Sequence, residues 1–99
     1  MTNLNKQEIQ DSMKEIDISW VLKGKFIHRE IIFKDFVQAF SFMTSVAIIA
    51  EKAGHHPNWK NVYNKVTIAL NTHDLDGLTN KDFQLAKGID QILKKLRLP

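Results

Sequence analysis

The sequence predicts an α+β protein: a four-stranded antiparallel sheet with three helices packed on one face, in the order α-β-β-α-β-β-α. Three observations support this fold class. Residues 20–33 and 59–72 each alternate apolar and polar side chains and each contain a turn signal. Segments with apolar residues at helical spacing lie before, between and after these hairpins. Hairpins separated by helices are typical of an antiparallel sheet covered on one side.

The first helix is predicted over residues 5–16. Asn5 is a favourable capping residue, and Glu8 follows three positions later, which is the spacing of a capping box. The apolar residues of the segment recur at helical spacing: Ile9, Met13 and Ile16.

The first hairpin is predicted to pair residues 20–22 with residues 25–33 through a turn at Lys23-Gly24. The second arm has two faces, Phe26, His28, Glu30 and Ile32 on one, and Ile27, Arg29, Ile31 and Phe33 on the other. His28 lies among charged neighbours, so we expect it to be a surface residue of the strand.

The longest helix is predicted over residues 34–53, with Gly54 as its stop. Its uncharged part, residues 36–50, is shorter than the roughly 20 residues of a membrane span, so no membrane is expected. Its residues form three stripes: Phe36, Phe40, Met43, Ala47 and Ala50; Val37, Ser41, Thr44 and Ile48; Phe42, Val46 and Ile49. Because one sheet face buries only one stripe, we expect copies of this helix to pair in a homodimer or homotetramer.

The second hairpin is predicted over residues 59–72, with a turn near Asn64-Lys65. Its second arm places Val66, Ile68 and Leu70 on one face, and Thr67, Ala69, Asn71 and His73 on the other. After a turn around Asp76-Gly77, Thr79 caps the last helix and Asp82 completes a capping box. The apolar stripe of that helix is Phe83, Ala86, Ile89, Leu93 and Leu96.

Composition indicates one domain over residues 1–99, with 43% hydrophobic and 25% charged residues. The net charge of +3 is mild, and Lys94, Lys95 and Arg97 suit the C-terminus of a helix. No dense basic patch with interleaved aromatic residues is present, so no nucleic acid partner is expected. The first residues lack the apolar run of a signal peptide, and we expect a cytoplasmic protein.

Several classes of site are excluded by the residues that are missing. The chain has no cysteine, which excludes disulfides, thiol nucleophiles and cysteine-bound zinc. It also has no Gly-x-Ser-x-Gly motif of serine hydrolases and no glycine-rich phosphate loop. Histidines are therefore the candidate groups for chemistry.

His55 and His56 stand between the predicted helix stop and Pro57, which restricts His56 to extended backbone. His73 ends a strand that returns from this region. Imidazole has an ordinary pKa of about 6.5, so several imidazoles in one site can divide proton donation and acceptance. Two other interpretations stay open from spacing alone: ordinary surface histidines, or a zinc site. Zinc is disfavoured because neighbouring residues seldom point at one metal, and we expect no metal.

Four runs form a specific pattern around these histidines: Phe-Lys-Asp-Phe at 33–36, Glu-Lys-Ala-Gly-His-His-Pro-Asn-Trp at 51–59, Val-Tyr-Asn-Lys-Val-Thr-Ile-Ala-Leu-Asn-Thr-His-Asp at 62–74, and Gly-Leu-Thr-Asn-Lys-Asp at 77–82. Each run alone is a weak signal. Together they resemble the pterin-4a-carbinolamine dehydratase family, from about Trp20 to the last helix.

The resemblance implies a fold and a reaction. Members have a four-stranded antiparallel sheet with three helices on one face, form dimers or tetramers through the long helix, and need no metal or other cofactor. The implied reaction removes water from 4a-hydroxytetrahydrobiopterin or a related pterin, a product of aromatic amino-acid hydroxylases. The product is the quinonoid dihydropterin.

The family's active-site histidines correspond to His55, His56 and His73. We expect His55 and His73 to transfer protons and His56 mainly to orient the substrate. The implied substrate-binding positions are Glu51, Trp59, Thr72, Asp74 and Asp82. Trp59 is equally consistent with an ordinary core residue, and Asp82 with a helix cap alone.

One residue departs from the family's pattern: Gly54 stands where some members carry an acidic residue before the histidine pair. We expect this change to affect rate rather than the class of reaction. Some animal members also act as dimerisation cofactors of a transcription factor, so a binding role is the alternative function, and an assembly helper without activity is a third. Because this chain keeps all three histidines, dehydration is the preferred prediction.

Overall fold

The computed structural model describes residues 2–96, which adopt the predicted α+β fold with the order α-β-β-α-β-β-α. The strands are β1 Val21–Lys23, β2 Phe26–Ile32, β3 Asn58–Val62 and β4 Lys65–Leu70. The helices are α1 Lys6–Met13, α2 Phe36–Ala53 and α3 Asn80–Leu96, and a short 3-10 helix, η1 His73–Leu75, precedes α3. Arg97, one of the cations noted near the C-terminus, lies outside the described residues.

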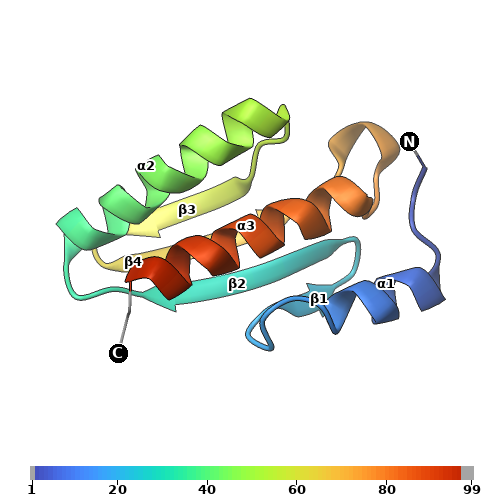
Figure 1. The fold of residues 1–99 in the computed structure, drawn as a ribbon, viewed down its shortest axis with the longest axis horizontal. Coiled ribbons are helices and arrows are strands. Elements are labelled where there is room, and N and C mark those ends of the chain that lie inside the picture. Colours follow the sequence, from blue (N-terminus) through green and yellow to red (C-terminus); the bar gives the residue numbers. More distant parts are fainter. Residues whose placement is uncertain (1, 97–99) are drawn as a thin grey trace.

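The four strands form one antiparallel sheet in the spatial order β1-β2-β4-β3, and α2 and α3 lie side by side across one of its faces (Figure 1). Apolar and polar side chains alternate along the central strands, as predicted, so one face of the sheet is apolar and covered by helices and the opposite face is open. The buried residues of the two central strands are Ile27, Ile31, Val66, Ile68 and Leu70. Helix α1 adds Ile9 and Met13 to the edge of the same core.

Helix α1 begins as predicted but ends earlier. The Asn5 side chain accepts a hydrogen bond from the Glu8 N–H at 2.8 Å, and the Asn5 N–H donates to Glu8 Oε1 at 2.9 Å. The helix ends at Met13, three residues before the predicted end, and Ile16 is buried from the following loop. The carboxylate of Asp90 on α3 holds this loop, accepting the Asp17 N–H at 2.9 Å. That tertiary contact ends the helix where local spacing alone favours another turn.

Helix α2 has one buried and one exposed apolar side. The buried residues are Ala39, Phe42, Val46 and Ala50. The predicted stripes mixed the two sides, because Ala50 lies with Phe42 in the core and not with Phe36 and Phe40, which are about half exposed. By length and composition alone α2 is apolar enough to cross a membrane. Its buried side, however, packs against the sheet and α3.

The second hairpin turns at residues 63–64, one position earlier than predicted, and β4 ends at Leu70. His73 therefore lies in η1 and not at the end of the strand. Asp82 accepts the Thr79 N–H at 2.9 Å, which is the acidic half of the predicted capping box. On α3, Leu85 is buried, whereas Leu96, predicted as part of the apolar stripe, is 38% exposed.

Candidate active site

The backbone at the end of α2 places the neighbouring residues His55 and His56 in different environments. Gly54 has a φ of 65°, in the left-handed region that glycine adopts without steric cost, and its N–H bonds back to the carbonyls of Ala50 and Glu51. His55 follows, and its N–H also bonds to the Ala50 carbonyl at 3.1 Å. The side chain of His55 is buried and that of His56 is exposed.

His55 belongs to a buried polar network at the start of α3. Its Nε2 lies 2.6 Å from Oδ1 of Asp82, a residue with no exposed surface. The other carboxylate oxygen of Asp82 accepts from Thr72 Oγ1 at 2.8 Å and from the Thr79 N–H at 2.9 Å. Thr72 and Thr79 also share a hydrogen bond at 2.7 Å. Because a buried carboxylate is costly without partners, this set of bonds ties the segments that follow α2 and β4 to the first turn of α3.

His56 and His73 line the same cavity, which has a volume of about 280 Å³. This volume lies just below the usual range for small-molecule pockets, about 300–1,000 Å³. The other lining residues are Phe26, Pro57, Asn58, Ala69 and Asn71. Phe26, Asn58 and Ala69 lie on the open face of β2, β3 and β4, and Pro57 and Asn71 adjoin the ends of β3 and β4. The cavity therefore lies on the side of the sheet opposite α2 and α3. Two imidazoles, two carboxamides and an aromatic ring suit a flat heterocycle with several hydrogen-bonding atoms.

The remaining predicted site residues occupy different environments. Glu51 Oε1 lies 2.8 Å from Nε2 of His56, and both side chains are largely exposed. Asp74 is an exposed residue of η1, beside His73. Trp59 pairs with Ile68 on the covered side of the sheet and packs against the core, so it does not line the cavity with His56 and His73. Of its two interpretations, this position favours the core residue.

The turn that carries His73 is held by the N-terminal segment. The Asn3 side chain donates to the Leu75 carbonyl at 2.9 Å, and the Leu4 N–H donates to the Leu78 carbonyl at 2.8 Å. A β-carbon on Gly77 would lie 2.9 Å from the Asn3 side chain, so a larger residue there would displace this contact. The position of His73 thus depends on residues about 70 positions away in the sequence.

On the outer side of the same turn, Lys25 forms an ion pair with Asp76 at 2.6 Å. The hydrogen bond and the charge of Lys25 lower the pKa of the Asp76 carboxyl from its ordinary value.

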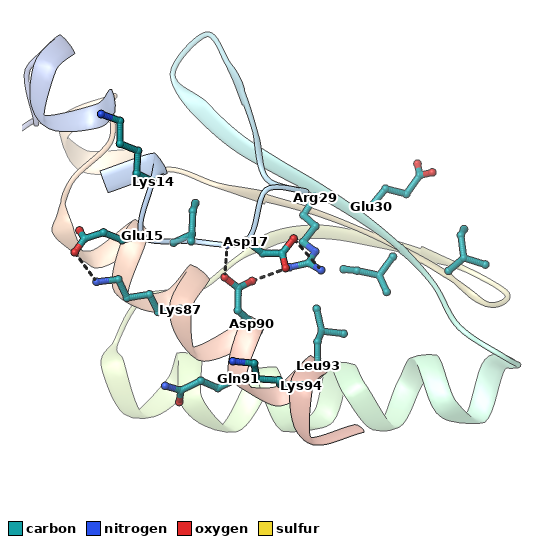
Figure 2. A pocket seen from close by; sticks show the side chains of 13 residues that line it. Lys14, Glu15, Asp17, Arg29, Glu30, Lys87, Asp90, Gln91, Leu93 and Lys94 are labelled. Carbon is teal, nitrogen blue, oxygen red and sulfur yellow. Dashed lines mark hydrogen bonds and ion pairs between the residues drawn. The ribbon is translucent and has the colours of Figure 1, made fainter. Parts of the chain in front are cut away.

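A larger groove of about 740 Å³ lies between the loop after α1, the second half of β2, and α3 (Figure 2). Its charged side chains are largely paired with one another: Arg29 donates to Asp90 at 2.7 Å, and Lys87 lies 3.7 Å from Glu15. None of the predicted site residues lines it. The charged side chains of the groove form ion pairs that link its elements. The smaller cavity is lined by two imidazoles instead. We therefore locate the candidate active site in the smaller cavity.

Metal ligation is not supported by the arrangement of side chains. Across residues 2–96, no group of three or more histidine, aspartate or glutamate side chains is placed to hold a metal ion.

Several cavity residues were not predicted from the sequence as site residues, namely Phe26, Asn58, Ala69 and Asn71. A partial signal was available for two of them, because Ala69 and Asn71 share the less apolar face of β4. Phe26 enters the cavity only because β2 pairs with β4, and that register joins residues 33 to 43 positions apart.

Known proteins share both the sequence and the fold. A family model described as "Pterin 4 alpha carbinolamine dehydratase" matches residues 2–92. A Christiangramia forsetii protein named "Putative pterin-4-alpha-carbinolamine dehydratase" is 47% identical over 94 residues, which cover 95% of this chain and 96% of the relative. A Prochlorococcus marinus (strain MIT 9312) protein of the same name is 51% identical over 89 residues, covering 90% of this chain and 92% of the relative.

Solved structures agree with this relationship. A structure described as a transcriptional coactivator/pterin dehydratase from Brucella melitensis matches with a TM-score of 0.87 and 38% identity, over 92% of this chain and 98% of that one. A pterin dehydratase-like protein identified as a RuBisCO assembly factor in the alpha-carboxysome matches with a TM-score of 0.64 and 25% identity, over 75% of this chain and 88% of that one. The predicted family is confirmed: this chain belongs to the pterin-4a-carbinolamine dehydratase family.

Proposed function

We propose that this protein is a dehydratase that converts a 4a-hydroxytetrahydropterin to the quinonoid dihydropterin, recycling the cofactor of aromatic amino-acid hydroxylases. The observation that carries the proposal is the pair of imidazoles, His56 and His73, on one small cavity in a member of this family. The similarly named relatives at about half identity support the same reaction.

The reaction needs one acid and one base. The C4a–O bond breaks as the hydroxyl accepts a proton and leaves as water. The N–H bond of the neighbouring ring nitrogen gives up its proton, and its electron pair forms the new C=N bond. No electrons are gained or lost overall, so neither an oxidant nor a reductant takes part. Neutral and protonated imidazoles near pH 7 suit both steps, and positioned acid–base groups typically accelerate such steps by about 10²–10⁴-fold.

The roles of the histidines follow their surroundings in this proposal. His56 and His73 transfer the protons, because both line the cavity. His55, which we expected from sequence to transfer a proton, instead positions its neighbours through Asp82 and Thr72. This division differs from the sequence-based one by exchanging His55 and His56.

Gly54 replaces the acidic residue that some family members carry before the histidine pair, but a carboxylate still lies beside His56. Glu51, one helical turn earlier, supplies it at 2.8 Å from His56 Nε2. A carboxylate at this distance can accept a hydrogen bond from the ring nitrogen, so Glu51 helps to orient the imidazole of His56. Both side chains are largely exposed, so this contact is weak.

A direct assay tests the function. A 4a-hydroxytetrahydropterin generated in situ should lose water faster with the protein than spontaneously, measured by ultraviolet absorbance. His56→Ala and His73→Ala should each slow the catalysed rate by roughly 10²–10⁴-fold while circular dichroism stays unchanged. Lys60→Ala, at an exposed position of β3, is the matched control and should keep the full rate. Absence of acceleration by the unmutated protein, or full activity in both histidine variants, would contradict the proposal.

We also propose that α2 pairs with copies of itself in a homodimer or homotetramer. Phe36, Val37, Phe40 and Ile48 are between 47% and 72% exposed on its outer side. Four large apolar side chains on one helix form a patch of the kind that another chain usually covers. Full burial of an exposed side chain of this kind is worth about 1.5–3 kcal/mol, and these are about half to three-quarters exposed, so each contributes part of that value. Summed over two helices, the contribution competes with the estimated 4–15 kcal/mol cost of association. A cytoplasmic location stays a prediction.

A further inference from the structure

The imidazole of His73, one of the two proposed to transfer protons, is placed in the cavity by its backbone. His73 is exposed, and within residues 2–96 its ring nitrogens have no hydrogen-bond partner. The ring of His56, by contrast, lies 2.8 Å from the carboxylate of Glu51. The position of the His73 ring therefore depends on where the backbone of η1 lies.

The base of the turn that carries η1 is fixed by buried contacts. Thr72 and Gly77 pair across it, with the Thr72 N–H donating to the Gly77 carbonyl at 2.8 Å. The hydroxyl of Thr72 also donates to the buried carboxylate of Asp82 at 2.8 Å. The tip of the turn, residues 73–76, extends beyond this pairing and is mostly exposed. Contacts from other parts of the chain are needed to fix the tip.

Within residues 2–96, two side chains from outside the turn form hydrogen bonds with its tip. On one side Lys25 pairs with Asp76 at 2.6 Å, but the two side chains are 62% and 78% exposed, and exposed ion pairs contribute little to stability. On the other side the Asn3 side chain donates to the Leu75 carbonyl at 2.9 Å. This second bond acts on the backbone of η1 itself, two residues after His73.

Asn3 is in turn fixed by the residues that follow it. Leu4 packs against the core, and its N–H donates to the carbonyl of Leu78 at 2.8 Å. Asn5 then begins α1 with its capping box. The segment before α1 consequently runs beside the turn between β4 and α3 (Figure 1). The side chain at position 3 thus reaches the turn from a backbone that is held on its C-terminal side.

The turn has room for the Asn3 side chain because residue 77 is a glycine. A β-carbon on Gly77 would lie 2.9 Å from Cγ and Oδ1 of Asn3 and 3.0 Å from its Nδ2, and these are the three nearest atoms that it would meet. Gly77 does not have the positive φ that favours glycine at Gly24 and Gly54. Gly77→Ala should therefore displace the Asn3 side chain without straining the backbone.

We infer that Asn3 is a positioning residue of the candidate active site, which keeps the His73 imidazole in the cavity by holding η1 through the Leu75 carbonyl. This inference rests on the proposed function, in which His73 transfers a proton. One neutral hydrogen bond corresponds to a roughly two- to twelvefold change in the population of the held turn. Because proton transfer requires the imidazole within hydrogen-bond reach of the substrate, kcat should fall with that population.

Asn3→Asp and Asn3→Ala test the bond. The aspartate keeps the size of the side chain, but its ionised carboxylate accepts and does not donate, so it cannot bond to the Leu75 carbonyl. The alanine removes the donor without adding charge. In both variants kcat for a 4a-hydroxytetrahydropterin should fall roughly two- to tenfold, with a smaller change in KM. Gln7→Ala is the matched control and should leave kcat unchanged, because Gln7 is exposed and bonds to Asp11 within α1.

Double variants show whether Asn3 acts through the turn and through His73. Gly77→Ala should lower kcat to the same extent as Asn3→Ala, and the double variant should be no slower than either one, because both changes remove the same bond. In a His73→Ala protein, Asn3→Ala should not lower the residual rate further, whereas a general loss of structure would lower it. Additive effects in either pair would overturn the inference.

NMR of the histidine side chains separates this inference from the proposed reaction. The imidazole resonances of His73 should shift or broaden in Asn3→Ala, and those of His56 should not. A protein without turnover would overturn the dehydratase function, and the NMR comparison would still decide whether Asn3 fixes His73. Unchanged His73 resonances in Asn3→Ala, or an unchanged kcat of this variant in an active protein, would overturn the inference and leave the dehydratase function intact.

Discussion

The buried carboxylate of Asp82 provides the sharpest test of how this site is built. It accepts three hydrogen bonds, from His55 Nε2 at 2.6 Å, Thr72 Oγ1 at 2.8 Å and the Thr79 N–H at 2.9 Å. Asp82→Asn keeps the size of the side chain and changes one oxygen to an NH₂ group. The remaining oxygen can still accept the hydrogen bonds from Thr72 Oγ1 and the Thr79 N–H, so the NH₂ group faces His55 Nε2.

The expected cost follows from the bond that is lost. A carboxylate oxygen accepts, so Nε2 of His55 donates in the unmutated protein. In the variant the NH₂ group is itself a donor, so His55 must move its proton to Nδ1, and a neutral hydrogen bond replaces the charged one. Losing a hydrogen bond to a charged group costs about 1.5–3 kcal/mol, and the other two bonds weaken as the charge disappears, for a total of about 2–4 kcal/mol. For a chain of this size each kcal/mol corresponds to roughly 4–8 °C, so the melting temperature should fall by at least about 8 °C.

Thermal and urea unfolding measure this loss, and nitrogen NMR shifts of His55 should report a change of tautomer, with the proton moving to Nδ1. Asp74→Asn is the matched control, because Asp74 is exposed and its replacement should change stability by no more than about 0.5 kcal/mol. An Asp82→Asn protein that melts within about 4 °C of the unmutated one, with an unchanged His55 tautomer, would refute this account of the network.

Three further predictions concern assembly, pH and metal. Sedimentation at micromolar concentration should detect a dimer or tetramer that the double variant Val37→Glu, Ile48→Glu dissociates; a monomeric unmutated protein would contradict the role of α2. The folded-state pKa of His28 is lowered from 6.5 by burial and by Lys23, so its contribution to stability is present above about pH 6.5 and lost as pH falls through the lower folded value. His28→Gln should therefore lose less melting temperature than the unmutated protein between pH 7.5 and 5; equal losses would exclude this linkage. Dehydration activity should survive prolonged chelation, and stoichiometric zinc whose removal abolishes activity would disprove metal independence.

Sequence alone determined the features that depend on neighbours three or four residues apart, or on simple alternation. The capping box of Asn5 and Glu8, the stop at Gly54 and the two faces of β2 and β4 are all of this kind. Because caps and side-chain alternation act locally, a single chain carries enough information to predict them. The family resemblance rested on the same local runs.

Only the tertiary structure decided which of the candidate residues share a cavity. Sequence alone does not tell which of the adjacent His55 and His56 is buried. In the structure Asp82, 27 residues after His55, binds the ring of His55 in the core, and His56 lies beside the cavity. Trp59 lies on the covered side because of its pairing with Ile68, and Phe26 faces the cavity because β2 pairs with β4. These positions depend on strand register and on hydrogen-bond partners from distant parts of the chain, which form only when the helices and the sheet pack together.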